Sequence, residues 1–149
     1  MNNNYKNNHG RNESSRATSM QVNIQFREET YVDEAEKVIK ELGRFNFKHG
    51  RDELTTSQIR NLLSLVSTIF NELSFKEVTQ LTGKLSYLRV QFVYQSGRNA
   101  AVKDLVRTGK ILELLEKVQT SKDKRMLIRF CHYFEALVAY FKYYGGQDK

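Results

Sequence analysis

Nucleophilic and acid–base side chains are few in this sequence, and their spacing does not favour catalysis. Cys131 and His132 are neighbours, so on a helix their side chains point about 100° apart. Cys131 also borders an apolar stripe, which favours a buried structural cysteine. Glu113 and Glu116 lie opposite an apolar face and beside lysines, as on a solvated helix surface. We therefore predict that the chain is not an enzyme.

Metal and cofactor sites are not predicted either. No group of His, Cys, Asp or Glu has a metal-binding spacing, and no glycine-rich loop precedes a helix with a phosphate-binding lysine. The single cysteine allows no internal disulfide and suits a reducing compartment. No apolar run approaches the ~20 residues of a membrane span, and no signal peptide is evident. We expect a cytoplasmic protein that does not bind a membrane.

Positive charge is the chemical feature that stands out. The net charge is +7, and the segment 84–129 holds eleven basic and four acidic residues, whereas the rest of the chain is balanced. A localised excess of this kind is expected of a protein that binds a polyanion such as nucleic acid. A lysine-rich surface without such a partner is the alternative.

Three polar helix faces are candidates for the contact with nucleic acid. The last helix combines charge with small residues, through which a phosphate backbone can approach closely. A short helix after Gly97 directs two cations away from its apolar side, and the outer face of a long helix carries mainly hydroxyls. Ordinary solvated faces remain the alternative for each. The residues concerned are Arg125, Arg129, His132, Ala136, Ala139 and Tyr143; Lys103 and Arg107; and Ser57, Arg60, Ser64, Ser67 and Asn71.

The segments that carry these residues are predicted to be helices. Proline is absent, although roughly seven would be usual at this length, and this favours helices joined by short connections. Thr30 is placed to cap a first helix, and Thr55 with Gln58 forms a capping box at the start of a long one. Ser74 and Glu77 repeat that signature before a short helix.

The second half of the chain shows four further helical patterns. Residues 84–96 are apolar on two opposite faces, so this helix is either central in the core or shared with a partner. One helix is predicted before Gly109 and another after it. Ser121 is the predicted cap of the last helix of the chain. We predict an all-α, compact bundle of five to seven helices over residues 29–149.

The N-terminal segment 1–28 is predicted to be a flexible, asparagine-rich leader. Its first part is polar and aperiodic, which is typical of a disordered tail. Met20, Val22, Ile24 and Phe26 then alternate with polar residues, which indicates either a strand or an extended arm lying on the domain or on a partner.

A helix-turn-helix over residues 57–82 is an alternative, which would make the chain a DNA-binding regulator. Its recognition helix would have Lys76 as its only basic residue, which suits a major-groove reader poorly.

Several strings, in their order, resemble the small subunit of the type III-A CRISPR (Csm) effector complex. The resemblance covers residues 30–148 and includes a last aromatic helix that ends in two glycines. The strings are Tyr31–Glu36, Thr55–Arg60, Tyr87–Val90, Tyr94–Arg98, and Tyr133–Tyr140 running into Lys142–Gly146.

This resemblance implies a non-catalytic subunit of an antiviral ribonucleoprotein. Members of the family are expected to stack in several copies along the crRNA–target RNA duplex, beside the backbone subunits and the large subunit. A duplex held by its backbone needs cations but no code for base edges. The resemblance makes Arg60, Arg89, Arg98, Arg125, Arg129 and Lys142 the candidate RNA contacts, with Arg51, Lys103, Arg107 and Lys124 as weaker additions.

Overall fold

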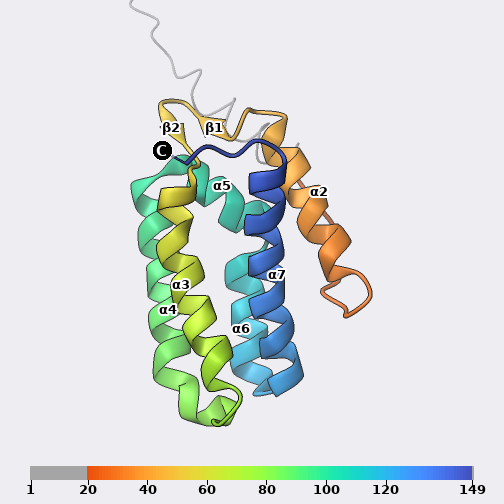
Figure 1. Cartoon of the computed structure of the whole chain (residues 1–149), viewed down its shortest axis with the longest axis vertical. Coiled ribbons are helices and arrows are strands. Elements are labelled where there is room, and N and C mark those ends of the chain that lie inside the picture. The colour runs from red at the N-terminus through yellow and green to blue at the C-terminus, as the bar shows by residue number, and fades with distance from the viewer. Residues whose placement is uncertain (1–19, 149) are drawn as a thin grey trace, which may run out of the picture.

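The computed structural model describes residues 20–148, and the following statements refer to that part of the chain. It contains six α-helices: α2 (Tyr31–Gly43), α3 (Thr56–Glu72), α4 (Thr82–Arg98), α5 (Ala100–Thr108), α6 (Ile111–Ser121) and α7 (Lys124–Tyr143). A hairpin of β1 (Lys48–His49) and β2 (Asp52–Glu53) and a 3-10 helix, η1 (Val78–Leu81), complete it. The predicted all-α bundle is confirmed (Figure 1).

Four helices run side by side along the long axis of the molecule: α3, α4, α6 and α7 (Figure 1). Helix α2 packs on α7, and α5 lies across one end of the bundle against α4 and α6. The hairpin lies at that same end, and so does the C-terminal segment that leads from α7 back to α3 (Figure 1). The core consists of the apolar faces that these helices turn toward one another.

Helix starts agree with the predicted caps in two cases and differ in two. Helix α2 follows Thr30 as predicted, although the Thr30 side chain makes no capping hydrogen bond, and the Thr55 N–H donates to Gln58 Oε1 at 2.9 Å at the start of α3. The predicted Ser74–Glu77 box is wrong, because Glu77 and Gln80 instead form the pair that opens η1. Asp123, rather than Ser121, caps α7, since its carboxylate accepts the Arg125 N–H at 2.8 Å.

Residues 57–82 lack the second helix that a helix-turn-helix requires. The short helix predicted after Ser74 is a single 3-10 turn, Val78–Leu81, and α4 begins directly after it and includes Gly83. A turn of four residues cannot enter a major groove as a recognition helix does. The structure therefore contradicts the alternative of a DNA-binding regulator built on residues 57–82.

The buried face of α7 includes a tyrosine whose hydroxyl has a partner in the core. Tyr133 is completely buried, and its hydroxyl donates to the Gly109 carbonyl at 2.8 Å, which satisfies both groups in the core. Gly109 is required there, because a Cβ would lie 2.9 Å from the Leu105 carbonyl oxygen. Phe70 on α3 and Tyr144 after α7 are 39% and 37% exposed.

The segment from Met20 to Glu28, which we call the arm, lies on the helices. It contains no strand, so of the two predicted conformations the extended arm on the domain is the one observed. Met20, Val22 and Phe26 are buried, so contacts with the bundle begin before the predicted boundary at residue 29. The remainder of the predicted leader, residues 1–19, lies outside the described residues.

Candidate nucleic-acid interface

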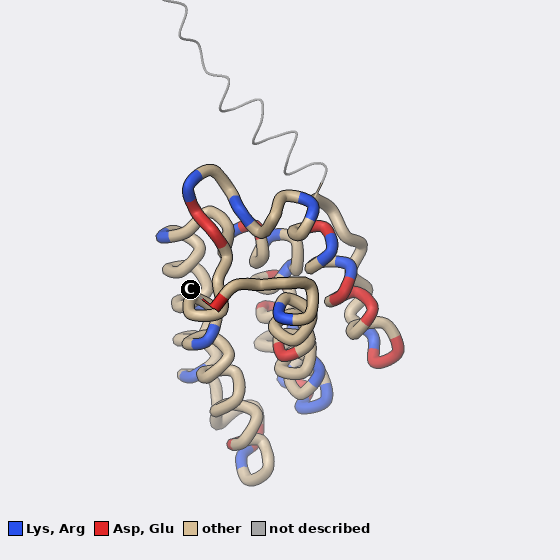
Figure 2. The backbone as a smooth tube through the Cα atoms, turned by 45° about the horizontal axis from the view of Figure 1, so that its top comes forward, with Lys and Arg blue, Asp and Glu red and all other residues tan. Residues whose placement is uncertain are grey.

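The basic residues are distributed over the hairpin, the helices and the loops that join them (Figure 2). Arg51, Arg60, Arg89, Lys124 and Arg125 are exposed. The ten residues predicted to contact RNA do not lie on one face of the structure. Their surroundings differ from one part of the surface to another.

One cleft of about 710 Å³ brings two of the predicted cations together with a third. Lys103 and Arg107 of α5 line it, and so does Lys110, which stands between α5 and α6. All three are exposed, and within residues 20–148 none of their charged groups forms an ion pair or a side-chain hydrogen bond. We call this the α5 cleft. Three such cations around one concavity suit an anionic ligand.

The hairpin fixes the helix that carries this cleft. Asp52 of β2 accepts the Ala100 N–H at 2.8 Å, and Asn99 caps α5 by accepting the N–H groups of Ala101 and Val102 at 2.8 and 3.0 Å. The Asn99 side-chain amide also donates to the Glu53 carbonyl at 3.3 Å. The first turn of α5 is therefore held by the Asp52 side chain of the hairpin and by its own cap, Asn99, which in turn binds the hairpin backbone.

The lining of the α5 cleft includes a polar pair, in which Asp104 is buried and His49 is partly buried. His49 Nδ1 lies 2.9 Å from Asp104 Oδ2, and the Asp104 carboxylate is almost completely buried. The beginning of the arm, Met20 to Asn23, also lines the cleft. Sequence reasoning did not find Lys110 or this pair. Lys110 lies after the end of α5 with a left-handed φ of 52°, so helical spacing from Lys103 and Arg107 could not have placed it in the cleft.

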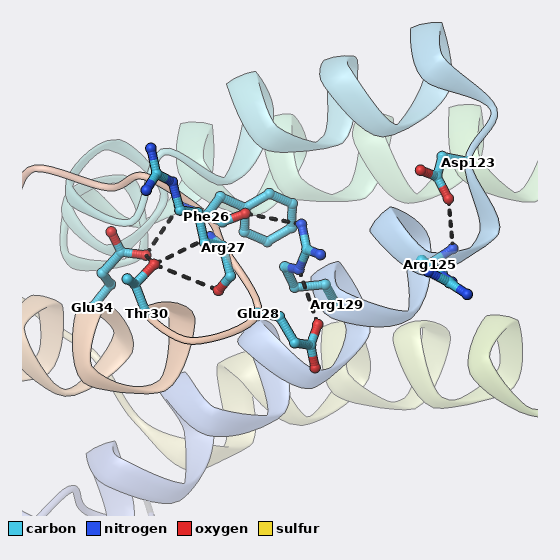
Figure 3. A network of polar contacts seen from close by, with 8 residues as sticks. All are labelled: Phe26, Arg27, Glu28, Thr30, Glu34, Asp123, Arg125 and Arg129. Carbon is cyan, nitrogen blue, oxygen red and sulfur yellow. Dashed lines mark hydrogen bonds and ion pairs between the residues drawn. The ribbon is translucent and has the colours of Figure 1, made fainter.

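Arg129, on the polar face of α7, contacts the arm, whereas the sequence predicted an RNA contact for it. The Arg129 side chain is 20% exposed, and its Nη1 donates to the Phe26 carbonyl at 3.0 Å (Figure 3). Its Nε donates to Glu28 Oε2 at 3.2 Å, and the guanidinium lies 5.5 Å from the centre of the Phe26 ring. Arg129 therefore fastens the arm to α7, whereas Arg125, one turn earlier, points away from this network (Figure 3).

A second contact holds the arm from α2. Glu34 is buried, and its Oε1 accepts the Phe26 N–H and the Thr30 hydroxyl, each at 3.0 Å. Its Oε2 accepts the N–H of Gln25. Figure 3 shows this carboxylate and Arg129 on either side of Phe26. The charged groups closest to the arm are thus used to hold it in place.

The other predicted contacts lie apart from the α5 cleft. Lys142 pairs with Asp148, and this hydrogen bond is the main cause that holds the pKa of the Asp148 carboxyl below its ordinary value. The C-terminal segment is fixed to α3, since the Thr56 N–H donates to the Gln147 carbonyl at 2.9 Å. On α4, the Arg98 guanidinium lies 5.6 Å from the centre of the Tyr94 ring.

The residues considered for catalysis are not arranged for it. Cys131 is 3% exposed, and burial raises the pKa of its thiol to about 12, which keeps it protonated near neutral pH. The His132 ring packs against Phe70, with 5.1 Å between the ring centres. Within residues 20–148 no three His, Cys, Asp or Glu residues are placed to hold a metal ion. No helix in this range is long and apolar enough to span a bilayer.

Comparison with known proteins identifies the family. Residues 27–147 match the family described as Csm2 Type III-A. A protein named CRISPR system Cms protein Csm2 from Streptococcus thermophilus is 52% identical over 121 residues, which cover 81% of this chain and 96% of that protein. Proteins of the same name from Mycobacterium tuberculosis and Enterococcus italicus are 48% and 37% identical, over 82% and 76% of this chain and 97% and 89% of their own lengths. The resemblance expected from the sequence is confirmed: the chain belongs to the Csm2 family of type III-A CRISPR systems.

Proposed function

We propose that this chain is the non-catalytic small subunit of a type III-A effector complex in antiviral defence. In this proposal several copies stack along the duplex of crRNA and target RNA, in contact with the backbone subunits and the large subunit. The chain binds the sugar–phosphate backbone independently of sequence and helps to hold the assembly together. The family membership supports the place in the complex, and the charges described above support the contact with RNA.

The α5 cleft is the observation that carries the RNA-binding part of the proposal. Its three cations project from one rigid helix and its C-terminal end, and no described residue neutralises them. Phosphate groups spaced along an RNA strand would satisfy them and release bound counterions. Sequence-independent binding follows, because ammonium and guanidinium groups in such a site contact phosphates rather than base edges.

The other cations of the predicted set contribute less in this proposal. Arg125 and Lys124, at the beginning of α7, are exposed and are suited to a second, weaker phosphate contact. Arg129 and Lys142 already have partners within the chain, so RNA would have to replace an existing interaction. A surface charge that exchanges one ion pair for another gains little free energy.

The test compares the α5 cleft with charges elsewhere. Lys103→Ala/Arg107→Ala/Lys110→Ala is measured against Arg27→Ala/Lys37→Ala/Lys117→Ala, which removes the same charges from other exposed positions. Each purified protein is titrated with a crRNA–target RNA duplex over a salt series. We expect the cleft variant to bind on the order of 100-fold more weakly at low salt, if each contact contributes about 1 kcal/mol.

The salt dependence provides a second readout. The plot of log affinity against log salt should become less steep by roughly 2 to 3 for the cleft variant, since each lost phosphate contact lowers the slope by a little under 1. The control variant should bind nearly as tightly as the natural chain. Equal losses of affinity in the two variants would mean that only net charge matters, and the proposed RNA contact at the α5 cleft would be wrong.

A further inference from the structure

The beginning of the arm contributes uncharged polar groups to the α5 cleft. Met20 and Val22 are buried against the bundle, whereas Gln21 and Asn23 alternate with them and are exposed. All four residues line the cleft. Because alternate side chains of an extended segment lie on opposite sides, the two apolar side chains hold the segment down and the two amides remain on its solvent side. The cleft therefore offers a ligand both cations from α5 and amides from the arm.

The backbone of this part of the arm has no hydrogen-bond partner among the described residues. From Met20 to Ile24, no N–H or carbonyl group is paired within residues 20–148, and neither are the side-chain amides of Gln21 and Asn23. Exposed groups of this kind are hydrated and can exchange water for the hydroxyl or phosphate oxygen of a ligand. The arm thus presents hydrogen-bond donors and acceptors that carry no net charge.

The other end of the arm is fixed, and this sets the direction of the segment that lines the cleft. Phe26 has a φ of 57°, in the left-handed region that bulky residues rarely adopt. Glu34 accepts the N–H groups of Gln25 and Phe26. Arg129 donates to the Phe26 carbonyl at 3.0 Å. A residue in such a conformation persists only when its surroundings hold it. The exposed amides therefore lie a few residues from a rigid anchor.

The cations and the amides match two different parts of an RNA backbone. Ammonium and guanidinium groups bind the phosphates of RNA and DNA alike, so the cations of the cleft do not distinguish the two. A neutral amide can accept a hydrogen bond from the ribose 2′-hydroxyl or donate one to it. In double-stranded RNA the 2′-hydroxyls lie in the wide, shallow minor groove, where proteins contact them together with phosphates. An RNA strand whose phosphates bind α5 can thus bring its ribose groups to the arm.

A second cleft, which the arm also lines, is less suited to RNA. Residues 21–23 and helix α2 line this cleft, whose volume is about 500 Å³. Its lining includes the acidic residues Asp33, Glu34 and Glu41, and carboxylates repel phosphates. Among the described residues that line the α5 cleft, the one acidic residue is Asp104, which is buried. The amides of the arm are therefore expected to meet RNA in the α5 cleft.

We propose that Gln21 and Asn23 bind the ribose 2′-hydroxyl groups of RNA in the α5 cleft and give this chain a preference for RNA over DNA. The proposal rests on the RNA contact proposed above and adds the groups that select the sugar. Neither amide needs to reach a base edge, so binding stays independent of sequence. Both residues precede the family-matched region 27–147, so the preference belongs to a segment outside that region.

Duplexes with and without the hydroxyl test this contact. Gln21→Ala/Asn23→Ala is compared with Gln25→Ala/Asn61→Ala, which removes the same two amides at exposed positions outside the cleft. Each full-length protein is titrated with a crRNA–target RNA duplex and with its 2′-fluoro counterpart, which keeps the A-form shape and the charge but lacks the hydroxyl. The natural chain and the control should prefer RNA by about tenfold, the effect of one or two hydrogen bonds. Gln21→Ala/Asn23→Ala should reduce this preference to less than about twofold.

A salt series separates the sugar contact from the phosphate contact. The slope of log affinity against log salt should be the same for Gln21→Ala/Asn23→Ala and the natural chain, because no charge is removed. Lys103→Ala/Arg107→Ala/Lys110→Ala should instead weaken binding to both duplexes alike. If Gln21→Ala/Asn23→Ala keeps the preference, or the natural chain binds both duplexes equally, the sugar contact is wrong while the phosphate contact stands. If the triple variant binds both duplexes as tightly as the natural chain, the phosphate contact is wrong, and so is the sugar contact that rests on it.

Discussion

The α5 cleft and the polar face of α7 carry the same kinds of side chain at the same helical spacing, but the two regions use them differently. Lys103 and Arg107 on α5 point into a cleft without partners among the described residues, whereas Arg129 on α7 binds Phe26 and Glu28. The difference comes from the arm, which is about 100 residues distant in sequence from α7. Helical spacing predicts which cations share a face, but tertiary contacts decide which of them remain available.

The arm also connects the two regions. Its beginning, Met20 to Asn23, forms one wall of the α5 cleft, and its end, Phe26 to Glu28, is fastened by Arg129. Loss of the fastening on α7 should therefore alter the cleft, while loss of the cleft cations should leave the fastening intact. The following predictions test how the arm and the charges of the two regions contribute to the fold, beginning with the largest expected effect.

Phe26→Ala should destabilise the protein more than any single change to a charge in either region. The ring is 5% exposed and packs edge-on against Tyr133, with 5.9 Å between the ring centres. Removing a buried phenyl ring costs about 3 to 5 kcal/mol of unfolding free energy. Urea denaturation measures it, with Phe75→Ala as the control, since that ring is 71% exposed. Similar losses in the two variants would show that the arm does not contribute to the core.

Arg129→Met should cost about 1 to 3 kcal/mol of unfolding free energy, because it leaves the Phe26 carbonyl and Glu28 without their charged partner. Arg125→Met, one turn earlier, should change stability by less than about 0.5 kcal/mol, since no described residue binds its guanidinium. The same denaturation series provides both values. If the two arginines are equivalent in stability, Arg129 does not hold the arm.

Glu34→Gln should loosen the arm by about 1 kcal/mol, because the carboxylate accepts backbone N–H groups that a neutral amide binds more weakly. Amide hydrogen exchange at Gln25 and Phe26 measures this locally and should become faster by roughly fivefold. Exchange in α5 should stay as slow as in the natural chain. Unchanged exchange at Gln25 and Phe26 would mean that Glu34 does not hold the arm.

Asp148→Asn should have the smallest effect, because the residue is exposed at the end of the C-terminal segment. Its pKa is lowered in the folded chain, mainly by the Lys142 hydrogen bond, so the contact stabilises above the ordinary value of 3.8 and is lost as the pH falls below it. The melting temperatures of the two proteins should therefore differ slightly at pH 6 and become equal at acidic pH. A difference that grows as the pH falls would contradict this sign.

Much of the helical framework was predictable because its signals are local. The helical patterns, the break at Gly109 and the capping pair of Thr55 and Gln58 depend on residues within a few positions of one another. Asp123 was missed because Ser121 and Asp123 offer similar capping groups two residues apart, and only the path of the loop decides between them.

The candidate site was less predictable because it depends on contacts between distant segments. Lys110 belongs with Lys103 and Arg107 only because the turn at Gly109 lets the chain continue beside α5. The pair of His49 and Asp104 joins residues 55 positions apart, and neither has a local pattern that marks it. The role of Arg129 depends on where the arm lies, which alternating apolar residues alone left open between a strand and an arm.

Mapping the RNA on the assembled complex tests the central claim most directly. Target RNA that contains 4-thiouridine is photocrosslinked within the complex, and the crosslinked peptides of this subunit are identified by mass spectrometry. We predict that most crosslinks fall within residues 99–111, around the α5 cleft, and that Lys103→Ala/Arg107→Ala/Lys110→Ala reduces them severalfold while the complex still assembles. Crosslinks concentrated on residues 125–132, and unaffected by that variant, would contradict the account.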